Sequence, residues 1–388
     1  MTTAGQYDWL AMLYLGGDDD LFEFGTQLLN EAKGVGSSNR VAIVAQHDPA
    51  QPKSMTRRGQ LLPGQWASQV IGETHGSPKD IVDFIDYAKR SFPASKRMLV
   101  LWDHGNGWQN VHAFESVMAA TVRLRIQDLS DVVHRQQGIN VLCFDSCLMA
   151  MIEIAYQLRE RVEYIVASEN VVPADSGWPY DSILRTLTVR PQTEPEQVVR
   201  SIVDGFCGSY NGSGQPVTLS AIKVAAVEPA VAAIDAFARE LIAACINGSR
   251  EQVMFARRYS QSFGNPDYVD LFSFCDELQR LVPDKRCIFD AAEEVKKAIH
   301  RLVIGTTRGG ARSIRGAHGI SVYFPDRPIS PLYYNLDFAQ PKTCMWASFI
   351  TMMAPKIAAP RRIEKPPSEC ICERDSGCEA SEHVLAHA

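Results

Sequence analysis

Uninterrupted apolar runs constrain the fold of this chain more than any other feature. Residues 97–103 and 139–145 read Arg-Met-Leu-Val-Leu-Trp-Asp and Ile-Asn-Val-Leu-Cys-Phe-Asp. Strands of this kind are buried on both faces and are typical of parallel sheets. Further strand candidates occupy 8–16, 40–46 and 163–167. Segments with helical spacing, such as 80–89, separate them, and this alternation predicts an α/β fold with a mostly parallel sheet.

The pattern divides the chain into three segments. Its 388 residues exceed the size at which a single hydrophobic core usually stops growing. We expect an α/β core in 1–190, a helical cover with sheet-extending strands in 191–353, and a disordered, polar tail in 354–388. Helical stretches of the second segment are expected at 195–206, 226–246, 268–282 and 289–302. Shorter strands are expected at 217–223 and 319–324, and a β-hairpin at 53–71.

Charge and hydropathy exclude several classes of partner. The chain has 39 basic and 45 acidic residues, a net charge of −6, so we expect no nucleic-acid partner. No stretch approaches the roughly 18 apolar residues that a membrane span needs, so we expect no membrane insertion. Residues 1–20 lack the features of a signal peptide. We therefore expect a cytoplasmic protein with reduced cysteines, although sequence upstream would still permit export.

A histidine and a cysteine follow two of the predicted strands. His104 comes directly after 97–103, and Cys147 lies two residues beyond 139–145. The carboxyl ends of parallel strands line the crevice in which open α/β sheets bind ligands. We expect a helix to begin at or just after Cys147, where its dipole would lower the pKa of the thiol. Together the two residues would supply a base and a nucleophile.

Residues beside this pair are suited to assist it. Gly105 has no side chain, so its backbone can approach a ligand closely. Its N–H and that of Cys147 are candidates for an oxyanion hole, in which one donor typically lowers a barrier by roughly 3 kcal/mol. Asp103 would either orient the imidazole or serve as a turn residue.

Three longer strings carry a family resemblance. LWDHGNGW (101–108), FDSCLMAMIE (144–153) and ASENVVPADSGWPYD (167–181) resemble the clostripain family of cysteine endopeptidases, which share a clan with caspases, gingipains and legumain. Weaker similarities extend the resemblance over most of 8–350. It implies a caspase-like three-layer α/β/α sandwich around a mostly parallel sheet, with a mainly helical C-terminal portion.

The resemblance also implies an activity and a specificity. His104 and Cys147 match the catalytic dyad, and the substrates would be proteins or peptides cleaved after Arg or Lys. Asp145 matches the acid that lines the primary specificity pocket, and Asp175 is the best match to a second pocket acid. A carboxylate can pair with a guanidinium through two hydrogen bonds. The alternatives are a strand-end residue for Asp145 and a turn residue for Asp175.

Activation and metal dependence are further implications. Several members of the family are zymogens that cut themselves between the histidine and the cysteine, where Arg123 and Arg125 are candidates. The alternative is an ordinary loop with solvated arginines. No cofactor is required, but some members need calcium. Weak oxygen ligands for calcium are available at Asp18, Asp19 and Asp20, but their position before the first helix favours capping of that helix and pairing with its dipole.

Two other functions compete with a protease. A non-catalytic caspase-like module, used for regulation or binding, would keep the fold without the activity. A receiver-like phospho-acceptor would use the acidic cluster after the first strand, but it needs a lysine at a later strand end, and no convincing one is present. The presence of both dyad residues favours the protease.

Overall fold

The computed structural model describes residues 7–16, 21–48, 55–74, 76–109, 112–114, 122–309 and 314–354. By its internal contacts the chain splits into one unit of Met1–Pro355 and a second of Lys356–Ala388. The second unit lies outside the described residues.

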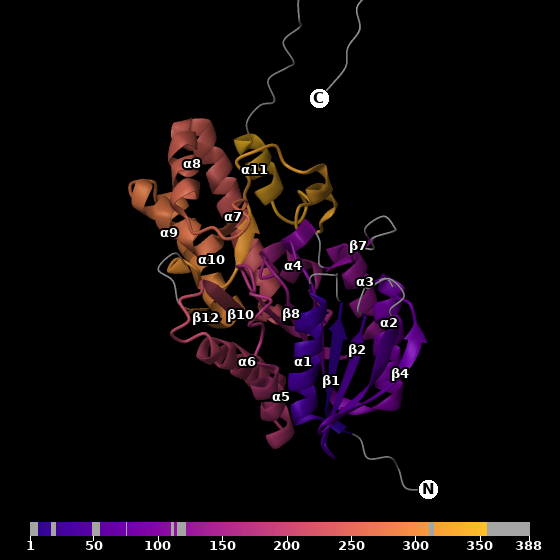
Figure 1. The fold of residues 1–388 in the computed structure, drawn as a ribbon. Helices are drawn as coiled ribbons and strands as arrows, with labels where there is room; N and C mark the ends of the chain where they lie inside the picture. The colour runs from indigo at the N-terminus through magenta and orange to yellow at the C-terminus, as the bar shows by residue number, and fades with distance from the viewer. Residues whose placement is uncertain are drawn as a thin grey trace, which may run out of the picture. The chain divides into compact units, whose positions relative to one another are not determined.

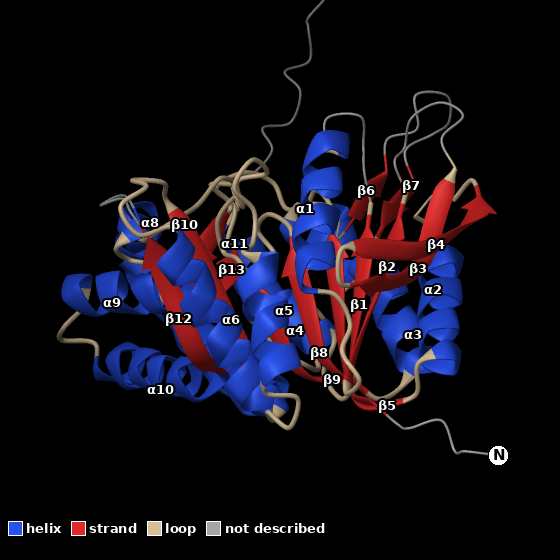
Figure 2. Ribbon diagram, turned by 60° about the horizontal axis from the view of Figure 1, so that its bottom comes forward, coloured by secondary structure: helices blue, strands red, loops and turns tan. Residues whose placement is uncertain are grey.

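A nine-stranded sheet, in the order β12-β10-β9-β8-β5-β1-β2-β3-β4, runs through the described part of the chain (Figure 2). Its five central strands are parallel. They are β1 (Tyr7–Leu15), β2 (Val41–His47), β5 (Ala94–Trp102), β8 (Ile139–Asp145) and β9 (Val162–Ala167). Antiparallel strands extend both edges. They are β3 (Thr56–Leu62) and β4 (Gln65–Gly72) on one side and β10 (Val217–Lys223) and β12 (Val303–Gly309) on the other.

The central strands are apolar throughout because helices cover both faces of the sheet. Along β1, Leu10 and Met12 belong to one hydrophobic core, whereas Ala11 and Leu13 belong to a second core on the opposite face. Side chains alternate between faces along a strand, so a strand covered on both sides needs apolar residues at every position. This arrangement confirms the predicted fold class, an α/β sandwich around a largely parallel sheet.

Two sets of helices form the outer layers. One face is covered by α1 (Phe22–Val35), α5 (Tyr180–Val189) and α6 (Pro195–Ser209), which lie in front of the sheet in Figure 2. The other is covered by α2 (Pro78–Ser91), α3 (Ile126–Gln136), α4 (Ile152–Gln157), α7 (Val227–Ala244) and α10 (Arg286–Leu302). The helices α8 (Arg250–Tyr259), α9 (Leu271–Leu281) and α11 (Trp346–Met353) gather with α7 and α10 at one end of the sheet (Figure 1).

Helix α2 illustrates how the local sequence determines where a helix begins. The hydroxyl of Ser77 accepts from the backbone N–H of Asp80 at 3.3 Å, and the Asp80 carboxylate accepts from the backbone N–H of Ser77 at 3.0 Å. Pro78 occupies the first turn, where a missing N–H costs nothing. This reciprocal capping box satisfies two amide groups that the helix itself leaves unpaired.

Two short antiparallel ladders lie outside the main sheet. The candidate at 319–324 forms β13 (Ser321–Tyr323), but it pairs with β11 (Tyr268–Asp270) and does not extend the main sheet as expected. In the second ladder, β6 (His112–Phe114) pairs with β7 (Val122–Leu124). Among the described helices, none has the length and apolar character to cross a bilayer.

Candidate active site

The register of β5 and β8 brings the two candidate reactive residues to one edge of the sheet. These strands are adjacent and parallel, and Trp102 is paired with Asp145 at their carboxyl ends. His104 lies two residues beyond Trp102, and Cys147 lies two residues beyond Asp145. Both residues therefore leave the sheet at the same level on neighbouring strands.

Gly105 packs directly against the backbone of Cys147. A Cβ atom placed on Gly105 would lie 2.5 Å from the carbonyl oxygen of Cys147 and 3.1 Å from its nitrogen. Real Cβ atoms essentially never lie 2.5 Å from backbone, so only glycine fits here without a shift of the main chain. The main chain that follows His104 thus touches the turn that carries Cys147.

The expected helix at Cys147 is wrong. Cys147 lies in a turn, Leu148 has a φ of 66°, and α4 begins only at Ile152. The thiol therefore gains nothing from a helix dipole. Burial raises the pKa of the Cys147 thiol, and the nearby Asp145 carboxylate raises it further. The backbone N–H of Val172, which donates to Sγ at 3.4 Å, acts in the opposite direction and favours the thiolate.

Aromatic residues from the second half of the chain hold the loop that follows His104. The Tyr268 hydroxyl donates to the carbonyl of Asn106 at 2.8 Å. A side chain on Gly107, whose φ is 59°, would meet the Tyr268 ring at 2.6 Å. Trp108 packs edge-on against Tyr323 and Tyr333, with ring centroids 5.2 and 5.1 Å apart. Sequence reasoning missed these supports, because they depend on contacts across more than 150 residues.

Asp103 was expected either to orient the imidazole or to serve as a turn residue, and one of its carboxylate oxygens serves the second role. Its Oδ1 accepts from the backbone N–H of His104 at 2.6 Å. The side chain is buried and so secures the end of β5. This bond fixes the direction in which the chain leaves the sheet towards His104.

A small pocket of about 260 Å³, open solvent included, is lined by both Asp145 and Asp175. Asp145 forms part of its wall at the end of β8 and is only 3% exposed. The Tyr180 hydroxyl donates to Asp145 at 2.8 Å. Burial raises the pKa of Asp145 to about 7, although the Tyr180 hydrogen bond lowers it in part. The other walls are formed by Trp102, Ala174, Ser176, Gly177, Trp178 and four residues of α1, Phe24, Gln27, Leu28 and Glu31.

The pocket carries three carboxylates from three separate elements. Asp175 is exposed in the loop after β9 and accepts a hydrogen bond from the Ser176 hydroxyl at 3.1 Å. Glu31 comes from α1. Burial is the largest cause of the raised pKa of Tyr180, and the charges of Asp145 and Glu31 raise this pKa further. The sequence pattern did not single out Glu31, since its position on α1 gives no sign that the helix packs beside Asp145. The three acids make the pocket suited to a cation.

The remaining candidates lie apart from this site or outside the described residues. The backbone of Arg123 belongs to β7, and Arg125 precedes α3, where its guanidinium pairs with both oxygens of Asp128 at 2.9 and 2.8 Å. The calcium candidates Asp18, Asp19 and Asp20 lie outside the described residues. Within the described ranges no group of three His, Cys, Asp or Glu side chains is arranged to hold a metal.

Comparison with known proteins places the chain in a family. The clostripain family, Peptidase_C11, matches residues 13–352. Clostripain from Hathewaya histolytica is 31% identical over 127 residues, which cover 28% of this chain and 24% of that protein. The aligned part thus spans about a quarter of the curated relative.

Solved structures share the fold over most of the chain. A secreted C11 cysteine protease from Bacteroides thetaiotaomicron, in complex with an irreversible peptide inhibitor, has a TM-score of 0.66 at 20% identity, covering 89% of this chain and 99% of its own. An inactive zymogen C11 protease from Parabacteroides distasonis has a TM-score of 0.64 at 19% identity, covering 87% and 98%. Since the family match spans nearly all of the described residues, this chain belongs to the clostripain family, as its motifs predicted.

Proposed function

We propose that this protein is a cysteine endopeptidase that cleaves peptide bonds after Arg or Lys through a Cys147–His104 dyad. The observation that carries the proposal is the register of β5 and β8, which delivers both residues at the same edge, with Gly105 against the Cys147 backbone. Membership of the clostripain family supports the reaction type.

The reaction proceeds in two stages. His104 accepts the proton of the Cys147 thiol, and the thiolate attacks the scissile carbonyl. The backbone N–H groups of Gly105 and Cys147 stabilise the oxyanion. The amine product leaves with a proton from His104, and an acyl-enzyme remains. His104 then takes a proton from water, which hydrolyses the thioester and restores the thiol.

The acidic pocket supplies the preference for basic residues. Asp145 is two residues from the nucleophile, and the loop that carries Asp175 is tied to Cys147 through the Val172 N–H. An arginine or lysine side chain beside the scissile bond would thus find its countercharge next to the reacting sulfur. Glu31 adds a third countercharge from α1.

Self-processing fits the same specificity. Arg123 and Arg125 lie between the two dyad residues. Cleavage after Arg123 would cut within β7, and cleavage after Arg125 would separate β7 from α3. Arg125 would first have to release its ion pair with Asp128. Mass spectra of the purified protein before and after incubation test this proposal. We expect two fragments, the first of which ends at one of these arginines.

The decisive test of the activity is a pair of cysteine variants. Fluorogenic peptides ending in Arg, Lys or Leu are incubated with the wild type, with Cys147→Ala and with Cys287→Ser, both with and without calcium. Cys287 is an exposed free cysteine on α10 and serves as the matched control. We expect release from the Arg or Lys peptides only, retained in Cys287→Ser and lost in Cys147→Ala.

Two outcomes would contradict the proposal. Release that survives Cys147→Ala would remove this thiol from the reaction. If no peptide is cleaved under any condition and an arginyl ketone does not label Cys147, the chain would instead be a non-catalytic module of the same fold.

A further inference from the structure

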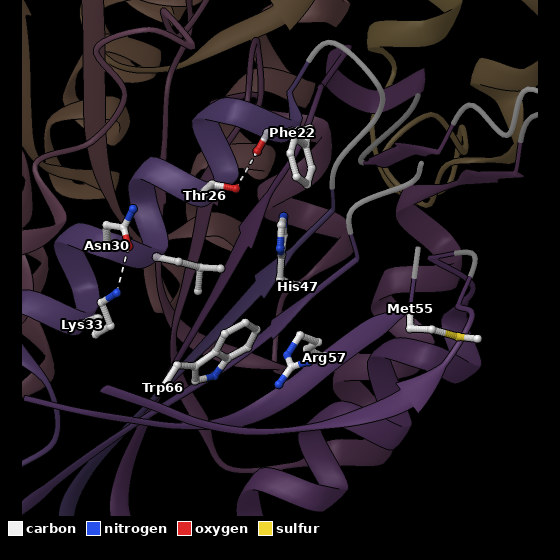
Figure 3. Close-up of a pocket in the computed structure, with 9 residues that line it drawn as sticks. Phe22, Thr26, Asn30, Lys33, His47, Met55, Arg57 and Trp66 are labelled. Atoms are coloured by element: carbon white, nitrogen blue, oxygen red, sulfur yellow. Dashed lines mark hydrogen bonds between the residues drawn. The ribbon is translucent and has the colours of Figure 1, made fainter. Parts of the chain in front are cut away.

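A second pocket lies beside the first helix. Its cavity volume is about 280 Å³, close to the lower limit for small-molecule sites. Helix α1, the end of β2, and the β3–β4 hairpin with Met55 before it enclose this pocket (Figure 3). The lining residues are Phe22, Thr26, Leu29, Asn30, Lys33, His47, Met55, Arg57 and Trp66. We call it the α1–hairpin pocket.

Apolar groups make up most of the exposed lining of the α1–hairpin pocket. The rings of Phe22 and Trp66 and the side chains of Leu29 and Met55 contribute to it. Met55 is 50% exposed, although methionine side chains are usually buried. Apolar surface inside a concave site is typical of a ligand-binding pocket.

The charged groups that the structure describes in the pocket are all of one sign. Lys33 and Arg57 are cationic, and no acidic side chain is among the described lining residues. Lys33 donates to Asn30 at 3.0 Å, and Arg57 donates to Ser68 at 3.1 Å while it lies 6.0 Å from the centre of the Trp66 ring. Neither cation is paired with a carboxylate in the part of the chain that the structure describes.

His47 adds a buried polar group to the wall. It is 7% exposed, and its ring stacks on Phe22 at a centroid distance of 6.1 Å. Its Nε2 has no hydrogen-bond partner among the described residues. Burial lowers the pKa of His47 to about 4, so the ring is neutral at neutral pH. Figure 3 shows the imidazole between Phe22 and Trp66.

We propose that the α1–hairpin pocket binds a small amphipathic organic anion. An aromatic or aliphatic body would pack on Phe22, Leu29 and Trp66, and a carboxylate or similar group would pair with Lys33 and Arg57. Charge complementarity favours this class of ligand, because the described part of the lining offers two cations and no acid.

The site is separate from the acidic substrate pocket but shares a helix with it. Different residues of α1 line the two pockets. At Gly25, a Cβ atom would lie 3.0 Å from Nε2 of His47 and 3.2 Å from the ring of Trp102. Because Gly25 has no side chain, His47 from the α1–hairpin pocket and Trp102 from the substrate pocket both lie close to the helix at this position. The acidic lining of the substrate pocket disfavours an anion there.

The test compares three naphthalene compounds of equal size and different charge. Isothermal titration calorimetry of the full chain is run with 1-naphthoate, 1-naphthalenemethanol and 1-naphthylmethylamine. We expect one saturable site for naphthoate, from which the alcohol and the amine displace naphthoate with about fivefold lower affinity, a ratio within the range of partly exposed charge pairs. Absence of saturable naphthoate binding, or equal binding of all three, would overturn the proposal.

Variants locate the site. Lys33→Gln and Arg57→Gln should each weaken naphthoate binding about threefold to fivefold. Arg301→Gln, an exposed cation on α10, and Asp145→Asn, in the substrate pocket, should leave it unchanged. Thr26→Trp, which places a ring over the pocket from an exposed position on α1, should abolish binding. Binding that is insensitive to both charge variants contradicts the assignment even if Thr26→Trp fails to fold.

Discussion

At the scale of single residues, Asp145 has the least ordinary environment in the proposed active site. It is almost fully buried, and its one described side-chain partner is a tyrosine hydroxyl. Since water solvates a carboxylate better than this site does, the neutral acid is favoured and the pKa rises to about 7. A cationic side chain in the pocket would compensate the charge and favour ionisation. On the proposed specificity, the pocket would therefore bind a basic side chain best when Asp145 is ionised.

This coupling predicts how the Michaelis constant depends on pH. As pH rises through about 7, Asp145 loses its proton, so KM for an arginine peptide should fall. In Asp145→Asn, KM should stay close to the wild-type value at pH 5.5 over the whole range, so the difference from the wild type should grow as pH rises. Measurement of KM and kcat separately between pH 5.5 and 8.5 checks the prediction. Parallel pH profiles of KM in the wild type and the variant would show that another group is responsible.

Glu31 should contribute less than Asp145 because it is only half buried. Glu31→Gln removes one charge and keeps the shape, so kcat/KM for arginine peptides should fall about threefold to fivefold. Glu23, which is exposed on the same helix and does not line the pocket, provides the control. Glu23→Gln should leave kcat/KM unchanged. Steady-state kinetics in which both variants behave alike would remove Glu31 from the pocket's function.

At the scale of elements, the loop after β5 is the part of the site that depends most on its neighbours. Gly105 touches the Cys147 backbone, and Tyr268 on β11 holds the Asn106 carbonyl. The loop thus connects the main sheet to the small β11–β13 ladder. Its geometry is fixed by contacts on both sides, so a small change in it should affect catalysis more than stability.

Gly105→Ala tests this dependence. The added methyl group would collide with the backbone of residue 147, so the loop must move, and kcat/KM should fall by about tenfold or more, as expected when reacting groups are misplaced. Gly34→Ala is the control, because no atom lies within 4 Å of its added Cβ and it belongs to α1. That change should preserve activity and slightly raise the melting temperature. Equal kinetics for the two variants would show that Gly105 is not a close-contact position.

At the scale of the whole molecule, burial explains which parts could be predicted from the sequence. The strands β8 and β10 have the bounds that the sequence predicted, because both are buried along nearly their whole length. The edge strand β12 was missed, since its polar, glycine-containing sequence lacks that signal. The sequence predicted a helix that begins at or just after Cys147, whereas α4 begins at Ile152. The turn between them has a positive φ at Leu148, and such a turn does not change the spacing of the apolar residues. Glu31 and Tyr268 were missed because only the folded chain brings them to the site.

The interleaved sheet predicts that cleavage between the dyad residues leaves one particle. A cut between β6 and β7 would leave β1–β5 on one fragment and β8, β9, β10 and β12 on the other. The fragments share the parallel pairing of β5 with β8, and both faces of that pair are buried under helices. Separation would expose this apolar surface to water, at a cost of roughly 25 cal/mol for each Å². To test this, a site for a sequence-specific protease is inserted between residues 118 and 119 and then cut. The two fragments should elute together at the intact size in native gel filtration and separate only in denaturant. Separate elution under native conditions would show that the β5–β8 junction does not hold the halves together.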